Sequence, residues 1–307
     1  MLTSTHEIEK INKNEYSSLI KINNDYLCNY EKNIELKEIL GDWIYNIKDL
    51  RERFTNAKPF SHIVIDNFLN HAYAANIENN LPRTTEGFFE YNNPLEVKYT
   101  YDNIDELHES VKNYFYLLSC KKFVKLVTSI TSINDLEIDE YLHGAGVHYQ
   151  PKYGRLQTHL DYEKHPYSGK ERKLNIIYML TKDWDPSWNG ANELWDEELK
   201  NCVQKTEFKF NRAIIFKTND ISWHGVPEII KCPENVFRKS LAYYYIGDLE
   251  KDKNIYRNKA NYKVNDNNLL TTYSDNINEL CKIRSIRRLE KRDIERLYSN
   301  WSKDKES

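Results

Sequence analysis

Two histidines and one aspartate have the residue types and the spacing of a metal-ligand set. His159 and Asp161 are separated by a single residue in the stretch QTHLD. Alternate residues of a β-strand point to the same side, so these side chains can present an imidazole and a carboxylate to one ion. His224, in the later stretch WHGVP, is far enough along the chain for intervening strands to return beside the first. Two imidazoles and one carboxylate on one face suit an Fe(II) ion that keeps open coordination positions.

A guanidinium group follows the second histidine at the start of a tyrosine-rich run. Arg238 and Ser240 open the stretch RKSLAYYYI and share one face at strand spacing. A guanidinium fork binds a carboxylate through two hydrogen bonds, and a neighbouring hydroxyl can add another. Beside the metal ligands, Arg238 therefore predicts a site for a dicarboxylic cosubstrate. The remaining histidines are interpreted as ordinary core or surface residues: His6, His62, His71, His108, His143, His148 and His165.

The ordered motifs over residues 147–247 resemble the prolyl-hydroxylase-like group of the Fe(II)/2-oxoglutarate oxygenases. That group shares the order His-x-Asp, a distal histidine, and then a basic residue. The stretches LNIIYMLTKDW at 174–184 and NRAIIF at 211–216 also resemble strands of the family. The stretch NGANELWD at 189–196 departs from the family's Gly-Gly-x-Leu turn. This departure alters a turn and leaves the expected metal ligands untouched.

The resemblance implies an activity and a set of cofactors. Fe(II) would be held by His159, Asp161 and His224, and 2-oxoglutarate and O₂ would be cosubstrates. The far carboxylate of 2-oxoglutarate would meet Arg238 and Ser240. The family couples decarboxylation of 2-oxoglutarate to succinate and CO₂ with hydroxylation of an unactivated C–H bond. The cofactor set that the resemblance implies can also include ascorbate.

Three further residues are expected near the cosubstrate. Family analogy places Tyr149 beside the site. Asn175 and Met179 lie on the strand face that is expected to look inward. An ordinary core position is the alternative for each of the three.

The pattern of apolar residues divides the chain into three parts. Residues 1–57 carry apolar residues at helical spacing, which predicts a helical N-terminal extension. Residues 58–265 are expected to form the oxygenase domain, with short strands and turns in a core over about 136–250. Residues 266–307 predict a basic C-terminal segment with a helix over 276–301. The expected fold is α+β and mainly β: a double-stranded β-helix, or jelly roll, flanked by N-terminal and C-terminal helices.

Local patterns predict further elements and two candidate substrate walls. Residues 63–65 are expected to form a strand, whereas 71–81 and 104–133 are expected to be helical. The jelly-roll strands are assigned to iron and cosubstrate, so specificity is expected to come from loops, namely 83–103 and 162–173. The residues that could contact a substrate there are Phe88, Phe89, Tyr91, Tyr99, Tyr101, His165 and Arg172.

Composition sets limits on the class of protein. The net charge of −3 over 307 residues requires neither a nucleic-acid nor a membrane partner. The five cysteines are odd in number and widely spread, which argues against a disulfide framework. No long apolar run occurs, so a soluble, cytoplasmic protein is expected. The substrate is expected to be a small molecule, a glycan or a protein side chain such as proline; the sequence does not indicate the oligomeric state.

The sequence is compatible with several alternatives to hydroxylation. Desaturation and epoxidation use the same ligands, whereas a related halogenase would lack Asp161. A catalytically silent jelly-roll binding module would have no need for three intact ligands. A zinc hydrolase can also use two histidines and a carboxylate, but it would not require Arg238.

Overall fold

The computed structural model describes residues 19–250, 252–264, 274–298 and 301–302. Residues 1–18 of the predicted N-terminal extension lie outside the described residues. The helices are α2 (Asn24–Asn33), α3 (Leu36–Ile39), η1 (Asp42–Tyr45), α4 (Ile47–Asn56), α5 (His71–Asn79), η2 (Ile104–Glu106), α6 (Glu109–Ser119), α7 (Lys121–Thr131), η3 (Pro186–Trp188), α8 (Ser274–Arg284) and α9 (Lys291–Leu297). The strands are β1 (His62–Asp66), β2 (Phe89–Asn93), β3 (Glu96–Tyr101), β4 (Glu137–Ile138), β5 (Gly146–Gln150), β6 (Arg155–Leu160), β7 (Glu171–Met179), β8 (Asn192–Trp195), β9 (Cys202–Thr206), β10 (Arg212–Lys217), β11 (His224–Val226), β12 (Arg238–Gly247) and β13 (Asn261–Tyr262).

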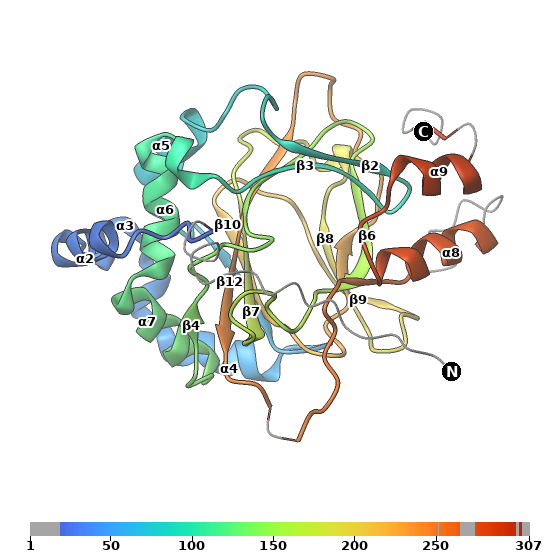
Figure 1. Cartoon of the computed structure of the whole chain (residues 1–307). Helices are drawn as coiled ribbons and strands as arrows, with labels where there is room; N and C mark the ends of the chain where they lie inside the picture. Colours follow the sequence, from blue (N-terminus) through green and yellow to red (C-terminus); the bar gives the residue numbers. More distant parts are fainter. Residues whose placement is uncertain (1–18, 251, 265–273, 299–300, 303–307) are drawn as a thin grey trace.

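The strands form one antiparallel sheet that folds over on itself. Its order is β1-β10-β7-β12-β5-β3-β6-β11-β8-β9, with β2 and β13 paired to β3 and β6, and β4 to β12. Strands from both halves of this order, including β7, β12, β6 and β11, contribute side chains to a single cavity. This is the double-stranded β-helix that the sequence predicts, and helices lie on both sides of it (Figure 1).

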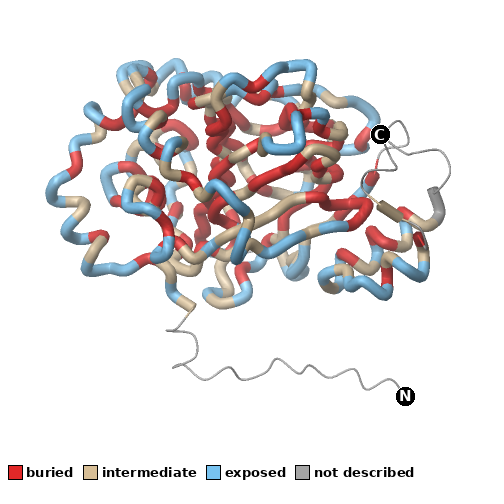
Figure 2. Tube along the Cα trace, turned by 90° about the horizontal axis from the view of Figure 1, so that it is seen from above, coloured by how far each residue is buried: buried red, intermediate tan, exposed pale blue. Residues whose placement is uncertain are grey.

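Strand β12 shows how the sheet separates the cavity from the helical layer. Arg238 and Ser240 face the cavity. The alternate residues face the helices: the Tyr243 hydroxyl lies 2.8 Å from the Ser119 hydroxyl of α6, and Tyr245 is also fully buried. Burying a large apolar side chain contributes about 1.5–3 kcal/mol, so this outer face anchors the strand. Figure 2 shows the buried residues gathered in the interior and the exposed residues along the outer turns of the tube.

The predicted strand at 63–65 and helix at 71–81 correspond to β1 and α5. The stretch 104–133 is helical but broken into η2, α6 and α7. Cys120 is extended, with φ −71° and ψ 144°, and it ends α6 and begins α7. An apolar stripe continues across such a break, and neither proline nor glycine marks it in the sequence.

The segment 83–103 differs most from its prediction as a flanking loop. It contains the β2–β3 hairpin, and β3 pairs with both β5 and β6 inside the sheet. The sheet therefore extends beyond the predicted core of 136–250. Glu96 and Lys98 lie on the face of β3 that lines the cavity, so this strand lacks the apolar inward positions by which strands are recognised. Exchanging this segment would remove a strand of the sheet, so it is not a separable recognition loop.

The basic C-terminal segment forms two helices instead of the single one expected over 276–301. Helix α9 begins after Glu290, which forms a reciprocal capping box with Asp293. Helix α8 packs on β13, and Arg284 at its end donates a hydrogen bond of 2.7 Å to the buried carboxylate of Glu96 on β3. Both C-terminal helices lie on the opposite side of the sheet from α2–α7 (Figure 1). Among the described residues, no helix is long and apolar enough to cross a membrane.

Candidate functional site

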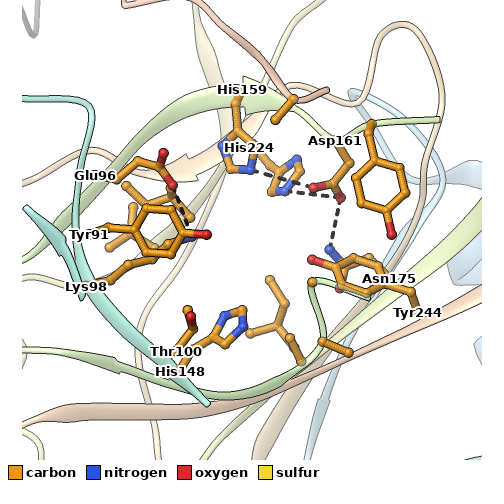
Figure 3. A pocket seen from close by; sticks show the side chains of 18 of the residues that line it. Tyr91, Glu96, Lys98, Thr100, His148, His159, Asp161, Asn175, His224 and Tyr244 are labelled. Atoms are coloured by element: carbon orange, nitrogen blue, oxygen red, sulfur yellow. Dashed lines mark hydrogen bonds and ion pairs between the residues drawn. The ribbon is translucent and has the colours of Figure 1, made fainter. Parts of the chain in front are cut away.

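The sheet brings the three expected metal ligands together. His159 on β6 and His224 on β11 are direct cross-strand partners, and Asp161 follows β6 by one residue. The Nε2 atoms of His159 and His224 lie 3.7 and 3.8 Å from the two Asp161 carboxylate oxygens. All three side chains are buried, and their donor atoms lie within 4.8 Å of one another. Figure 3 shows them converging on one side of the cavity.

Backbone carbonyl groups determine the tautomer of each histidine. The Nδ1 atom of His159 lies 2.9 Å from the Gln157 carbonyl oxygen, and that of His224 lies 2.9 Å from the Ser222 carbonyl oxygen. A carbonyl oxygen only accepts, so Nδ1–H must donate and the Nε2 lone pair points toward Asp161. Burial lowers the pKa of His159 to about 3 and lowers that of His224 as well. Both rings are therefore neutral near pH 7, the form that coordinates metals.

Asp161 is kept ionised by its neighbours. Burial raises its pKa, but the charge of Arg172 and a hydrogen bond from Asn175 help to lower it below the ordinary value. Arg172 Nη1 lies 3.4 Å from Asp161 Oδ1, and Asn175 Nδ2 lies 3.3 Å from Oδ2. The Arg172 guanidinium is itself fixed between the rings of Tyr162 and Tyr244, at 3.6 and 3.3 Å from their centroids. An ionised carboxylate and two neutral imidazoles form a donor set that fits Fe(II).

Arg238 enters the same cavity and lacks a carboxylate partner among the described residues. Its Nε donates to the Gly190 carbonyl at 2.7 Å and its Nη1 to the Gln150 side chain at 3.0 Å. Its Nη2 and the Gln150 Nε2 are buried without a partner. Burial lowers the pKa of Arg238 to about 9. The Ser240 hydroxyl lies on the same strand face, so these donors fit one carboxylate of a ligand that reaches the metal.

Gly190 makes room for this arginine. It has φ +86°, and a Cβ there would lie 3.1 Å from Arg238 Cδ. Both the backbone conformation and the close approach favour glycine. The departure from the family turn at Ala191 and Asn192 therefore leaves the glycine beside Arg238 in place.

Two of the expected cosubstrate residues do not line the cavity. Tyr149 lies on the opposite face of β5, where it packs on Phe88 and Phe237 and donates to the Pro82 carbonyl at 2.8 Å. Met179 shares the inward face of β7 but is fully buried in an apolar cluster outside the cavity lining. Asn175 does line the cavity, beside Asp161.

Substitution of Tyr149 tests whether this side chain stabilises the fold without taking part in cosubstrate binding. Tyr149→Phe removes one buried hydrogen bond, so the free energy of unfolding should fall by about 1 kcal/mol. The concentration of 2-oxoglutarate required for half-maximal succinate formation should not change. A urea titration and a cosubstrate titration measure the two quantities. A large rise in the 2-oxoglutarate requirement would show that Tyr149 does contribute to cosubstrate binding.

Sequence reasoning missed residues that share the cavity with the triad. His148 and Gln150 take the inward positions of β5 in place of Tyr149. Cross-strand pairing supplies the reason, because Ser240 faces His148 and Arg238 faces Gln150. Arg172 is expected from the sequence in a substrate-facing loop, but it is the second residue of β7 and contacts Asp161. The cavity has a volume of about 240 Å³.

Comparison with solved structures finds fold-level likenesses. A prolyl hydroxylase from Trichoplax adhaerens in complex with a peptide of hypoxia inducible factor has a TM-score of 0.49 and 17% identity, covering 67% of this chain and 94% of that one. A Pseudomonas putida prolyl-4-hydroxylase has a TM-score of 0.46 and 14% identity, with coverages of 67% and 99%. A prolyl 4-hydroxylase from Phytophthora capsici has a TM-score of 0.44 and 15% identity, with coverages of 84% and 75%. Scores this low set no constraint on the substrate.

Comparison at the sequence level is more specific. A search of curated proteins finds no match. The sequence model of the 2OG-Fe(II) oxygenase superfamily matches residues 145–246, a range that contains the triad and Arg238. Members of that superfamily use Fe(II), 2-oxoglutarate and O₂. Residues 145–246 of the chain, which contain all three proposed metal ligands and Arg238, therefore carry the sequence pattern of the 2OG-Fe(II) oxygenase superfamily.

Proposed function

We propose that this protein is a dioxygenase that hydroxylates an unactivated C–H bond and converts 2-oxoglutarate to succinate and CO₂. His159, Asp161 and His224 would hold Fe(II), and Arg238 with Ser240 would bind the far carboxylate of 2-oxoglutarate. The observation that carries the proposal is the buried, unpartnered Nη2 of Arg238 in the cavity of the triad. An uncompensated guanidinium is costly to bury, so its retention beside a metal-ligand set favours an anionic cosubstrate.

The chain's own residues would position the reactants. Bound iron supplies the oxidation chemistry that links O₂ and 2-oxoglutarate to attack on the substrate. The carbonyl groups of Gln157 and Ser222 hold the two imidazoles in the coordinating tautomer. Arg172 and Asn175 fix the orientation of Asp161. Arg238 sets the direction from which 2-oxoglutarate reaches the metal, and the surrounding strands limit access of water.

Two features favour hydroxylation over its alternatives. Asp161 occupies the carboxylate position that a halogenase would leave open for chloride. A zinc hydrolase would not require an arginine at the position of Arg238. Desaturation and epoxidation use the same groups, and the product distinguishes them from hydroxylation.

We also propose that residues 58–265 form the oxygenase domain and that 1–57 and 266–307 flank it. The substrate is proposed to be a small molecule, a glycan or a protein side chain such as proline.

Formation of succinate is the test of this function. Purified protein, supplied with Fe(II), 2-oxoglutarate and O₂, should release succinate slowly even without substrate and faster with it. An untargeted search for products that gain one oxygen atom in step with succinate then identifies the substrate. A protein that binds 2-oxoglutarate but never forms succinate, with any extract tested, would instead be a silent binding module.

A further inference from the structure

A group of charged and aromatic side chains lines the cavity next to the metal ligands. It joins the β2–β3 hairpin to the C-terminal helices. The Lys98 ammonium lies 3.3 Å from the Glu96 carboxylate and 4.9 Å from the centre of the Tyr91 ring. Arg284 holds the same Glu96 at 2.7 Å, and the Arg288 guanidinium lies 5.7 Å from the Tyr91 ring centre. Lys98, Arg284 and Arg288, grouped around Tyr91 and Glu96, are called the cationic wall.

The cationic wall adjoins the proposed iron site through one aromatic ring. Tyr262 on β13 stacks on His159, with ring centroids 4.9 Å apart and planes inclined by 16°. The Arg284 guanidinium lies 5.2 Å from the Tyr262 ring centre. A substrate group bound at this wall would therefore lie beside the metal. In Figure 3, Tyr91, Glu96 and Lys98 face the same space as His159 and Asp161.

The charges that line the cavity do not balance. Its cations are Lys98, Arg172, Arg238, Lys259, Arg284 and Arg288, and its anions are Glu96, Asp102 and Asp161. The charges of Fe(II) and of doubly ionised 2-oxoglutarate cancel, so these ligands leave the positive excess unchanged. Arg172 is matched by Asp161, but the one carboxylate at the wall, Glu96, faces both Lys98 and Arg284.

Arg288 contributes most clearly to this excess of positive charge. It lies on the exposed side of the wall, over the rings of Phe89 and Tyr91. In the part of the chain that the structure describes, no carboxylate lies within ion-pair distance of it. A guanidinium so placed can contact an entering anion without first breaking an ion pair.

The cavity continues past the wall into a groove. The groove has a volume of about 580 Å³ and lies between the β2–β3 hairpin and residues 288–298 and 301–302. It shares Tyr91, Glu96 and Arg288 with the metal cavity, and Phe89 adds an aromatic surface. A substrate larger than the metal cavity could place its remaining part there.

We propose that the substrate carries an anionic group, a phosphate or a carboxylate, which binds Lys98, Arg284 and Arg288 beside the metal centre. This inference rests on the proposed function and assigns a substrate class to it. The C-terminal helices then contribute to substrate recognition, because Arg284 ends α8 and Arg288 lies just beyond it. The oxidised C–H bond belongs to a group adjacent to the anion.

The test is binding of two labelled fragments, inorganic phosphate and acetate, by equilibrium dialysis. Excess 2-oxoglutarate is present so that Arg238 is occupied, and the measurement is made with and without Fe(II). We expect one fragment to bind the unaltered protein, and its identity distinguishes a phosphate substrate from a carboxylate substrate. Arg288→Gln should weaken that binding about tenfold, as expected for loss of a charged hydrogen-bonding partner, and Arg288→Glu should abolish it.

Arg292→Gln is the matched control. Arg292 is also on the C-terminal helices, but its side chain is 75% exposed, pairs with Glu290 and lines neither space. Fragment binding should be unchanged in this variant. Binding that is absent, or that falls equally in the Arg288 and Arg292 variants, would overturn the inference. Fe(II)-dependent binding of 2-oxoglutarate is measured separately in the same samples, so failure of the proposed function can be recognised independently.

Discussion

His159→Ala and Asp161→Ala should each abolish detectable Fe(II) binding and succinate formation. Loss of residues that merely orient a metal ligand typically lowers metal affinity or activity 10- to 100-fold, so loss of a ligand itself should lower affinity at least about 100-fold. The measurements are Fe(II) titration under anaerobic conditions and succinate formation in air. Full activity in either variant would refute the assignment of the triad.

The chain provides a matched control for the histidine substitution. His62 on β1 is buried like His159, at 7% and 5% exposure. Its Nδ1 also lies close to the carbonyl oxygen two residues earlier, at 2.8 Å from Phe60. His62→Ala therefore removes a similar ring and a similar contact away from the cavity. Some loss of stability is expected in His62→Ala, but its Fe(II) affinity should be retained.

Arg238→Ala should raise the 2-oxoglutarate requirement strongly while Fe(II) still binds. Loss of one partner of a buried, charged hydrogen-bonded pair costs about 2–5 kcal/mol, which corresponds to roughly 30-fold to several thousand-fold in the dissociation constant. The dissociation constant can be measured by anaerobic titration of the Fe(II)-loaded protein with 2-oxoglutarate.

Arg238→Lys separates charge from geometry at this position. Lysine keeps a positive charge but lacks the planar fork that also reaches Gly190 and Gln150. We expect an intermediate 2-oxoglutarate affinity for this variant. If both variants kept the original affinity, another cation of the cavity would have to bind the far carboxylate.

Features of the site that depend on spacing within one strand could be predicted from the sequence, whereas those that depend on pairing between strands could not. The shared direction of His159 and Asp161 follows from a spacing of two within one strand, and the shared direction of Arg238 and Ser240 follows in the same way. The structure brings both pairs into one cavity. Tyr149 was misplaced because its direction depends on the register between β5 and β12, which pairs it with Lys239. A register error of one residue reverses the face of every side chain in a strand.

The contribution of the C-terminal segment to the cavity could not be predicted from the sequence, for a different reason. In the sequence, Arg284 is one of several basic residues on a predicted amphipathic helix. Its contact with Glu96 joins residues that are 188 positions apart. Glu96 itself lies in a strand whose inward face is polar, so neither partner carries a local sign of the contact. Burial raises the pKa of Glu96, but the charges of Arg284 and Lys98 outweigh this and lower it to about 2.

The direct pairing of His159 with His224 has a consequence for the amount of protein in a cell. These residues face each other across β6 and β11, and the register shifts immediately afterwards, between His224 and Val226. An ion bound by both histidines would link the two strands at the position where their pairing is least regular. A ligand that binds only the folded state stabilises it by about 2.7 kcal/mol when its free concentration is 100 times its dissociation constant. Unfolded chains are removed by proteases, so the lifetime of this protein would depend on the iron supply of the cell as well as on its rate of synthesis.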